Sequence, residues 1–130
     1  MTDPISLAPG LTGSASLTVA DRDTAIAMRS GDVAVLATPR VVALAEQAAC
    51  AALSGRLGQD MTTVGVRVEV DHFKPTAVGD AVTATATLTT VQGRKLDFEV
   101  TVRAADVEVA RAQHRRVIAP RDAFPTSEAT

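Results

Sequence analysis

A long run of almost entirely apolar side chains, residues 39–53, is the feature that most constrains how this chain can fold. Thr38 and Pro39 make a helix start at this point, with a hydroxyl residue at the N-cap and proline at the first helical position. Gly55 is a stop signal, and we predict a helix from Thr38 to about Leu57. A surface helix has one apolar stripe, but this helix is apolar on nearly every face. Other structure must therefore enclose it.

Glu46 is the one carboxylate inside this apolar run. Burying an unpaired charge costs several kcal/mol, so a buried glutamate needs a partner or a function. Two interpretations are open: a glutamate that reaches past small neighbours to solvent, or a desolvated carboxylate that serves as a base or nucleophile. The second interpretation makes Glu46 the first candidate for a catalytic group.

Four segments with a two-residue alternation of side chains follow the helix, and each is predicted to be a strand. In the first of them the even positions are four valines followed by His72, and these are predicted to share the inner face. In the last, the broken alternation near Arg111–His114 predicts a bulge. The predicted strands are residues 63–72, 81–91, 95–103 and 107–118.

With a weaker first strand at residues 13–19, the order is strand, helix and four antiparallel strands. Threonine-rich faces suit an antiparallel sheet that is wet on one side. An antiparallel sheet wrapped around one long central helix is an α+β hotdog fold, and such sheets commonly pair edge to edge with ligands bound between subunits. We predict a hotdog domain over residues 13–118, a flexible arm at 1–12 and a flexible tail at 119–130. We also predict a homodimer with the active site at the subunit interface.

The spacing of the candidate residues bears on how they combine. A lone histidine on an apolar face is more often a core residue, but His72 and Glu46 converging in an apolar cleft would form an acid–base pair. Thr38 is explained by capping alone, although a helix N-terminus also suits an acyl oxygen or a phosphate. Roughly 12 Å of helix separates Thr38 from Glu46. Either His72 and the substrate lie between them, or the site is shared by two subunits, and we expect the shared site.

Composition and charge exclude several classes of function. The chain has no Trp or Tyr, only three Phe and a net charge of −2, which argues against nucleic-acid binding. Its single cysteine, Cys50, allows no intramolecular disulfide and is expected to be a small buried hydrophobe. The sequence contains no metal-ligand spacing, so we expect no metal and no cofactor. The absence of a signal-peptide pattern or a membrane-spanning apolar run predicts a cytoplasmic protein without membrane contact.

Short motifs between residues 15 and 118 occur in a characteristic order. They are Ala37-Thr38-Pro39, the helix with Glu46, Thr63-Val64-Gly65, His72, Val78-Gly79-Asp80, the Gly93-Arg94 turn and His114-Arg115-Arg116. Together they resemble the fluoroacetyl-CoA thioesterase family of hotdog proteins. The resemblance implies that Thr38, Glu46 and His72 form a catalytic set that hydrolyses an acyl-CoA thioester. It also implies that Gly65 and Arg116 contact the substrate, of which CoA is a part.

The chain departs from the fluoroacetyl-specific members of that family in one segment. Those members carry phenylalanines before the catalytic threonine, and these form an apolar gate over the acyl pocket. The corresponding segment, Met28–Leu36, has no aromatic residue and contains Arg29 and Asp32. A thioesterase for small or medium acyl groups therefore fits better. The alternatives are a non-catalytic acyl-CoA-binding hotdog domain and, with less support, a hotdog hydratase or dehydratase.

Overall fold

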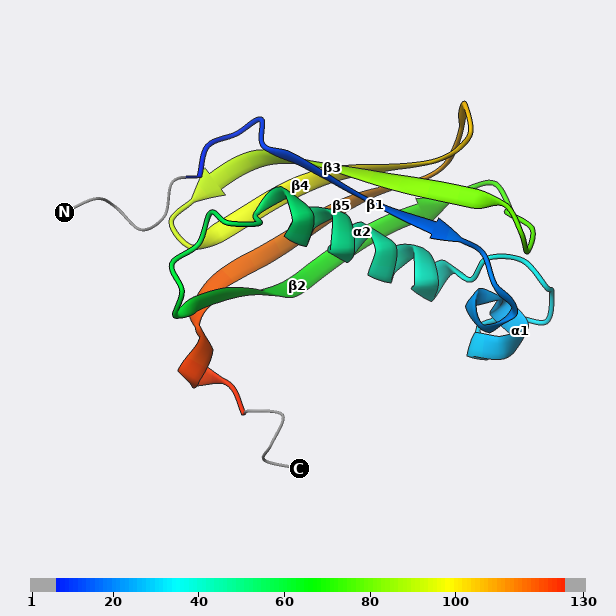
Figure 1. Cartoon of the computed structure of the whole chain (residues 1–130), viewed down its shortest axis with the longest axis horizontal. Coiled ribbons are helices and arrows are strands. Elements are labelled where there is room, and N and C mark those ends of the chain that lie inside the picture. Colours follow the sequence, from blue (N-terminus) through cyan, green and yellow to red (C-terminus); the bar gives the residue numbers. More distant parts are fainter. Residues whose placement is uncertain (1–6, 126–130) are drawn as a thin grey trace.

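A computed structural model describes residues 7–125, which form one antiparallel sheet and one main helix (Figure 1). The sheet order is β1-β3-β4-β5-β2, so β1 and β2 are its two edges. In Figure 1 the sheet curls around α2, which confirms the predicted architecture. The elements are β1 (Thr12–Thr18), α1 (Ala25–Met28), α2 (Thr38–Ala52), β2 (Met61–His72), β3 (Ala81–Gln92), β4 (Lys95–Ala104) and β5 (Val107–Pro120), with short 3-10 turns at Asp21–Asp23 and Arg121–Ala123.

The core lies between α2 and the inner face of the sheet. Strict alternation in β3 and β4 sends every second side chain to this core, as predicted from the sequence. The helix contributes small residues that let β1 approach closely. At Gly13 an added Cβ would overlap Ala52 N and lie 2.6 Å from Ala48 O. The buried side chains of β3 and β4 are Val82, Ala84, Ala86, Leu88, Leu96, Phe98, Val100 and Val102.

The expectation that α2 is enclosed on all sides is wrong for the single chain. The sheet covers one side of the helix, whereas Gln47 and Cys50 on the other side are exposed, and the Glu46 side chain is 41% exposed. Cys50 is therefore not the buried hydrophobe that was expected. The helix also ends at Ala52, earlier than predicted, because the chain turns into a left-handed conformation at Gly55 (φ +73°).

A bulge in β2 changes the predicted inner face of that strand. Gly65 pairs with Arg116 and Arg67 pairs with Arg115, so Val66 is an extra residue in β2. The predicted parity of the four valines is therefore wrong, because the residues before the bulge face the opposite way from those after it. The inner face consists of Thr63, Gly65, Val68, Val70 and His72, judged by their pairing with buried positions of β5.

The bulge predicted in β5 lies two residues before the expected position. Val102 pairs with Ala110 and Arg103 with Glu108, which leaves Val109 as the extra residue. The pairing across Arg111–His114 is regular.

The expected arm and tail fall partly outside the described residues, at 1–6 and 126–130. In the described parts of the arm and tail, Leu7 and Leu11 pack against the core, and Arg121 N donates to Asp60 O. No helix of the described part of the chain reaches the length and apolarity that a bilayer-spanning helix needs.

Candidate active site

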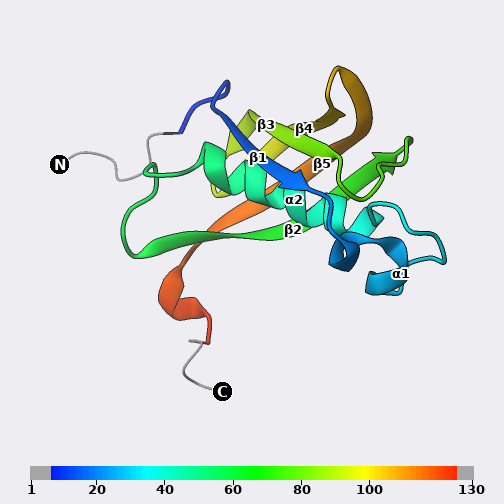
Figure 2. The ribbon, with the colours of Figure 1, turned by 45° about the vertical axis from the view of Figure 1, so that its right-hand side comes forward.

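The side chains of Thr38 and His72 meet at the first turn of α2. Thr38 Oγ1 and His72 Nδ1 are 2.8 Å apart, which is a hydrogen-bond distance. His72 is the last residue of β2, and this strand ends beside the start of the helix (Figures 1 and 2). A hydroxyl bonded to an imidazole is the arrangement by which a base activates or orients an alcohol.

Thr38 is available for this contact because it does not cap the helix. Ala37 is the N-cap residue, and α2 begins at Thr38, so the predicted threonine cap is wrong by one position. Ala37 O accepts the N–H groups of Arg40 and Val41. The N–H of Thr38, by contrast, has no acceptor within residues 7–125. A hydroxyl, an imidazole and a free N–H therefore meet at the positive end of α2.

The imidazole of His72 is suited to taking up a proton. Burial lowers the pKa of His72, an effect that the nearby backbone of Lys74 partly opposes. Its Nε2 is buried and has no hydrogen-bond partner in the described part of the chain. Burial thus favours the neutral ring, whose Nδ1 lies within reach of the Thr38 proton, as a general base requires.

An open hollow of about 320 Å³ borders Thr38 and His72. Its walls come from the segment between α1 and α2 and from the residues that follow β2. The apolar side chains in these walls are Ala25, Val33, Val35, Leu36, Ala37, Phe73 and Pro75, and the polar ones besides Thr38 and His72 are Ser30, Asp32 and Lys74. The hollow can therefore hold an aliphatic group next to the hydroxyl and the imidazole.

Glu46 belongs to a second cluster, built around Arg116. The Nη1 of Arg116 donates to Glu46 Oε2 at 3.2 Å, and its Nε donates to Thr63 Oγ1 at 2.9 Å. The same Nη1 lies 3.1 Å from His114 Nε2. These bonds satisfy a guanidinium that is only 7% exposed. Oε1 of Glu46 has no partner among the described residues, so the carboxylate has one bound and one free oxygen.

Gly65 allows this carboxylate to lie against the sheet. An added Cβ at Gly65 would overlap Glu46 Oε2 and would lie 3.0 Å from His114 Cε1 and 3.2 Å from Arg116 Nη1. Any side chain at this position would displace the Glu46 cluster. The glycine is therefore required for close approach of the carboxylate.

Two glycine-to-alanine variants are expected to separate activity from stability. Gly65→Ala pushes against the mobile end of Glu46, so activity is expected to fall up to about 100-fold while the free energy of unfolding changes by less than about 1 kcal/mol. Gly13→Ala instead pushes against the α2 backbone, and a loss of about 3 kcal/mol in stability is expected. Thiol-release assays and urea unfolding measure the two effects. The reverse pattern, with Gly65→Ala unstable and fully active when folded, would contradict this assignment.

Within one chain the two clusters stay apart. Glu46 abuts Gly65, and His72 lies seven residues further along β2, which is roughly 23 Å of strand. Thr38 lies roughly 12 Å from Glu46 along the helix. The structure thus brings Thr38 and His72 together and leaves Glu46 with Arg116, so the expected contact between His72 and Glu46 does not form in one subunit.

Sequence reasoning assigned no role to His114 or Thr63, which are both part of the Arg116 cluster. The signal was present in β5, where Ala110, Ala112, His114, Arg116 and Ile118 alternate and are all buried. Two polar side chains at inward positions of an apolar strand indicate a polar network. The predicted bulge near His114 hid this regular pattern.

Comparison with known proteins identifies relatives of this chain. A family model described as "Fluoroacetyl-CoA-specific thioesterase" (FlK) matches residues 19–122. The solved structure of the fluoroacetyl-CoA thioesterase FlK is 25% identical, with a TM-score of 0.85 over 92% of this chain and 93% of that chain. A mutant of FlK has been solved in complex with fluoroacetate and CoA.

Two bacterial structures are also similar. A hot-dog-like protein from Thermanaerovibrio acidaminovorans is 25% identical, with a TM-score of 0.81 over 88% of this chain and 85% of that one. A thioesterase superfamily member from Thermus thermophilus shares the fold at 20% identity, with a TM-score of 0.84 over 91% of this chain and 88% of that chain. No curated protein sequence matches the chain. Among residues 7–125, no group of three or more His, Cys, Asp or Glu side chains could hold a metal ion.

Proposed function

The chain belongs to the fluoroacetyl-CoA-specific thioesterase family and is an acyl-CoA thioester hydrolase, and we propose that it acts on small or medium acyl groups at a site shared by two subunits. The observation that carries this proposal is the hydrogen bond between Thr38 and His72 beside a partly apolar hollow at the start of α2. In this proposal the reaction uses water, and CoA enters as part of the substrate rather than as a cofactor.

The first half of the site binds and polarises the thioester. The carbonyl oxygen lies near the free N–H of Thr38, where the positive end of α2 stabilises the negative charge that develops during attack. The hydroxyl of Thr38 orients the carbonyl or attacks it, and His72 Nδ1, 2.8 Å from that hydroxyl, is the nitrogen that takes up and returns its proton.

The composition of the hollow supports a small or medium acyl group. Its apolar lining is aliphatic apart from Phe73, and the segment Met28–Leu36 offers no aromatic gate. A fluoroacetyl group is small and polarised, so an open hollow without such a gate has little means of selecting it over acetyl or propionyl groups. We therefore propose a general preference for small or medium aliphatic acyl-CoA substrates.

The second half of the site is the Glu46 cluster of another subunit. Glu46 is open to solvent on the uncovered side of α2, next to a hollow of about 240 Å³ lined by Val42, Val66 and Val68. Val66 is 54% exposed and Val68 is 36% exposed. Exposed valines beside a half-exposed carboxylate are the features expected of a surface that a second copy covers.

The β2 edge gives this second copy a way to bind. β2 is a 12-residue edge strand, and pairing of two such edges would continue the sheet across the dimer. We place the two-fold axis near residues 67–68, the middle of the exposed stretch. The partner subunit's His72 then lies opposite residues 62–64, beside Gly65 and Glu46. Two equivalent sites result, each with Thr38 and His72 from one subunit and Glu46 from the other.

Glu46 completes hydrolysis at that site through its free oxygen. Oε2 is held by Arg116, so Oε1 is the oxygen that either activates a water molecule or attacks the thioester to form a transient anhydride. A single turnover in ¹⁸O-labelled water distinguishes the two routes. Unlabelled oxygen in the product together with the label in the Glu46 carboxylate identifies attack by Glu46 and hydrolysis at the Glu46 carbonyl, whereas activation of water puts the label in the product and none in Glu46.

A panel of acyl-CoA esters is the experiment that tests this function. Release of free CoA, followed with a colorimetric thiol reagent, is expected for acetyl-, propionyl-, butyryl- and hexanoyl-CoA. We expect at most about 200-fold preference for fluoroacetyl-CoA over acetyl-CoA, because one small substituent in a pocket is worth roughly 1–3 kcal/mol, or about 10- to 200-fold. If no ester is hydrolysed while acyl-CoA raises the melting temperature, the chain is a binding module. Water addition to an enoyl-CoA without thiol release would instead indicate a hydratase.

A further inference from the structure

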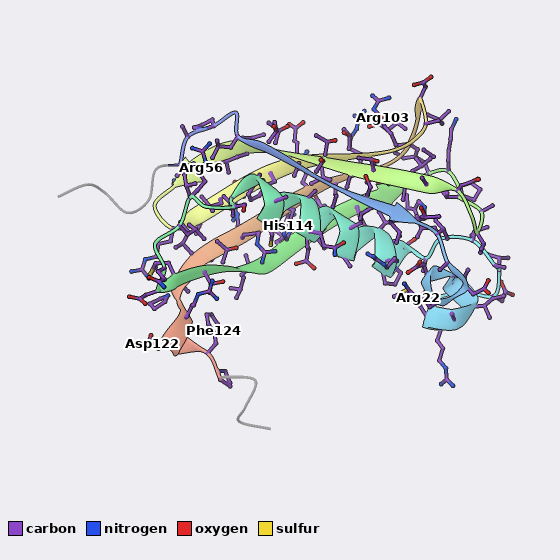
Figure 3. The ribbon with its side chains drawn as sticks, viewed as in Figure 1. Arg22, Arg56, Arg103, His114, Asp122 and Phe124 are labelled. Carbon is purple, nitrogen blue, oxygen red and sulfur yellow. The ribbon has the colours of Figure 1, made fainter. Side chains whose placement is uncertain are left out.

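His114 lies at the centre of the molecule, between α2 and the sheet (Figure 3), and is 3% exposed. Its Nδ1 is 2.8 Å from the backbone oxygen of Arg67, which lies directly after the bulge in β2. Its Nε2 is 3.1 Å from Arg116 Nη1 and 3.8 Å from Glu46 Oε2. The imidazole thus joins the bulge of β2 to the guanidinium and carboxylate of the proposed site.

The two partners of His114 determine where its proton is. The carbonyl oxygen of Arg67 can only accept a hydrogen bond, so Nδ1 carries the proton. The guanidinium of Arg116 can only donate, so Nε2 must be the accepting nitrogen. Only the neutral ring with the proton on Nδ1 satisfies both bonds.

We infer that His114 is a positioning residue for thioester hydrolysis, which holds Arg116 against Glu46 only while its imidazole is neutral. The inference deepens the proposed function and rests on the role that it gives to Glu46. With His114 neutral, Arg116 Nη1 is shared between Nε2 and Glu46 Oε2, and Oε1 is left free. When Nε2 of His114 is protonated, it and Arg116 Nη1 are both donors, so the hydrogen bond between them is lost. The imidazolium is then attracted to the carboxylate of Glu46, and Arg116 loses its position.

The groups around the ring support a neutral imidazole at physiological pH. Glu46 of α2 and Arg116 of β5 are the charged groups that face it, the backbone of Arg67 faces it from β2, and the neutral ring of Phe98 faces it from β4 with centroids 6.4 Å apart. Burial, helped by the charge of Arg116, lowers the pKa of His114, against the opposing effects of the Arg67 carbonyl and Glu46. The neutral form therefore persists to lower pH than in a free histidine and is lost on further acidification.

Two substitutions separate the two bonds of His114. In His114→Gln the amide oxygen can reach the position of Nε2 and accept from Arg116, and no titratable group remains. In His114→Asn the shorter amide can donate to Arg67 but cannot reach Arg116. We expect kcat within about threefold of wild type for His114→Gln, whereas kcat should fall about 10- to 100-fold, with KM little changed, for His114→Asn.

The pH profile is the readout that a structural role alone would not change. On its acid side, the kcat/KM profile of the wild type is expected to report the protonation of both His72 and His114. The profile of His114→Gln should report one proton fewer, because only His72 still titrates in the variant. Ile118→Val is the matched control: it trims a buried side chain on the same face of β5 and should lower the melting temperature without altering the acid limb. An unchanged limb in His114→Gln, or equal loss of kcat in both His114 variants, would overturn the inference.

Nitrogen-15 NMR tests the protonation state directly. The chain has only two histidines, so in His72→Ala every imidazole signal belongs to His114. At neutral pH we expect a protonated Nδ1 and an unprotonated Nε2, and a charged ring or a proton on Nε2 would overturn the inference. Failure of the proposed function is recognised separately, because it appears as no thiol release from any acyl-CoA ester or, for the role of Glu46, as full activity in Glu46→Gln. If Glu46→Gln loses activity but the His114 experiments contradict the expected protonation state, only the inference about His114 is rejected and the proposed function stands.

Discussion

Replacing Glu46 with glutamine is expected to lower kcat for acyl-CoA hydrolysis by about 100- to 10,000-fold, the range that a general base contributes. The amide keeps an oxygen that can accept the hydrogen bond from Arg116 Nη1. The buried guanidinium therefore stays satisfied, while the group at the free oxygen position can neither take a proton nor attack a thioester. Thiol release and circular dichroism measured on the same preparation give the activity and the folded fraction.

Glu99→Gln is the matched control for this variant. Glu99 is an exposed residue on the outer face of β4, so removing its charge changes the net charge equally without touching either cluster. Activity close to wild type is expected for Glu99→Gln. If Glu46→Gln keeps most of the wild-type kcat, Glu46 has no catalytic role.

A mixed dimer tests whether each active site takes its residues from two subunits. A heterodimer of one Glu46→Gln chain and one His72→Ala chain has one site with both native residues and one site with neither, if each site takes its residues from two subunits. Tandem purification on two affinity tags is expected to give a heterodimer with half of the wild-type kcat, although both parent homodimers are nearly inactive. A site contained within one chain would leave the heterodimer inactive as well.

The sequence predicts this fold well because the alternation in β3 and β4 is unbroken. Every second residue from Val82 to Leu88 is buried against α2, so hydrophobic periodicity and three-dimensional structure coincide there. The same rule fails in β2, where Val64, Val66 and Val68 continue a perfect two-residue pattern across a bulge. A bulge adds a residue without changing the residue types around it, and the pairing partner on β5 is what reveals it.

The residues of the candidate site could be predicted from the sequence, but their arrangement could be predicted only in part. The helix starts at Thr38 rather than after it, and this shift of one residue releases the hydroxyl to bond with His72. Nothing local in the Ala37-Thr38-Pro39 motif distinguishes the two positions. The role of Arg116 as the ligand of Glu46 depends on pairing between β2 and β5, residues far apart in sequence. Such a contact follows from the register of the sheet and not from local patterns.

A glutamate in place of Val68 is expected to separate the proposed dimer. Val68 faces inward on the β2 edge and is 36% exposed in the single chain, so the proposed dimer would bury it beside the symmetry axis. Leaving an unpaired charge buried costs roughly 3–5 kcal/mol, and two carboxylates near one axis also repel each other. We expect dimerisation to weaken by roughly 100- to 1,000-fold or more, since each 1.4 kcal/mol is tenfold. Light scattering during gel filtration measures the mass.

Activity should then depend on the concentration of the Val68→Glu protein, because each site needs residues from two subunits. At low concentration the variant is expected to be monomeric and at least about 100-fold less active, and its specific activity should rise as the chains associate at high concentration. Val107→Glu places the same charge on a valine that is 45% exposed at the β4–β5 hairpin, away from the β2 edge. This control should remain dimeric and active. A monomeric Val68→Glu with full, concentration-independent activity would place the whole site within one chain, and Glu46 would then have to act without the partner subunit's His72.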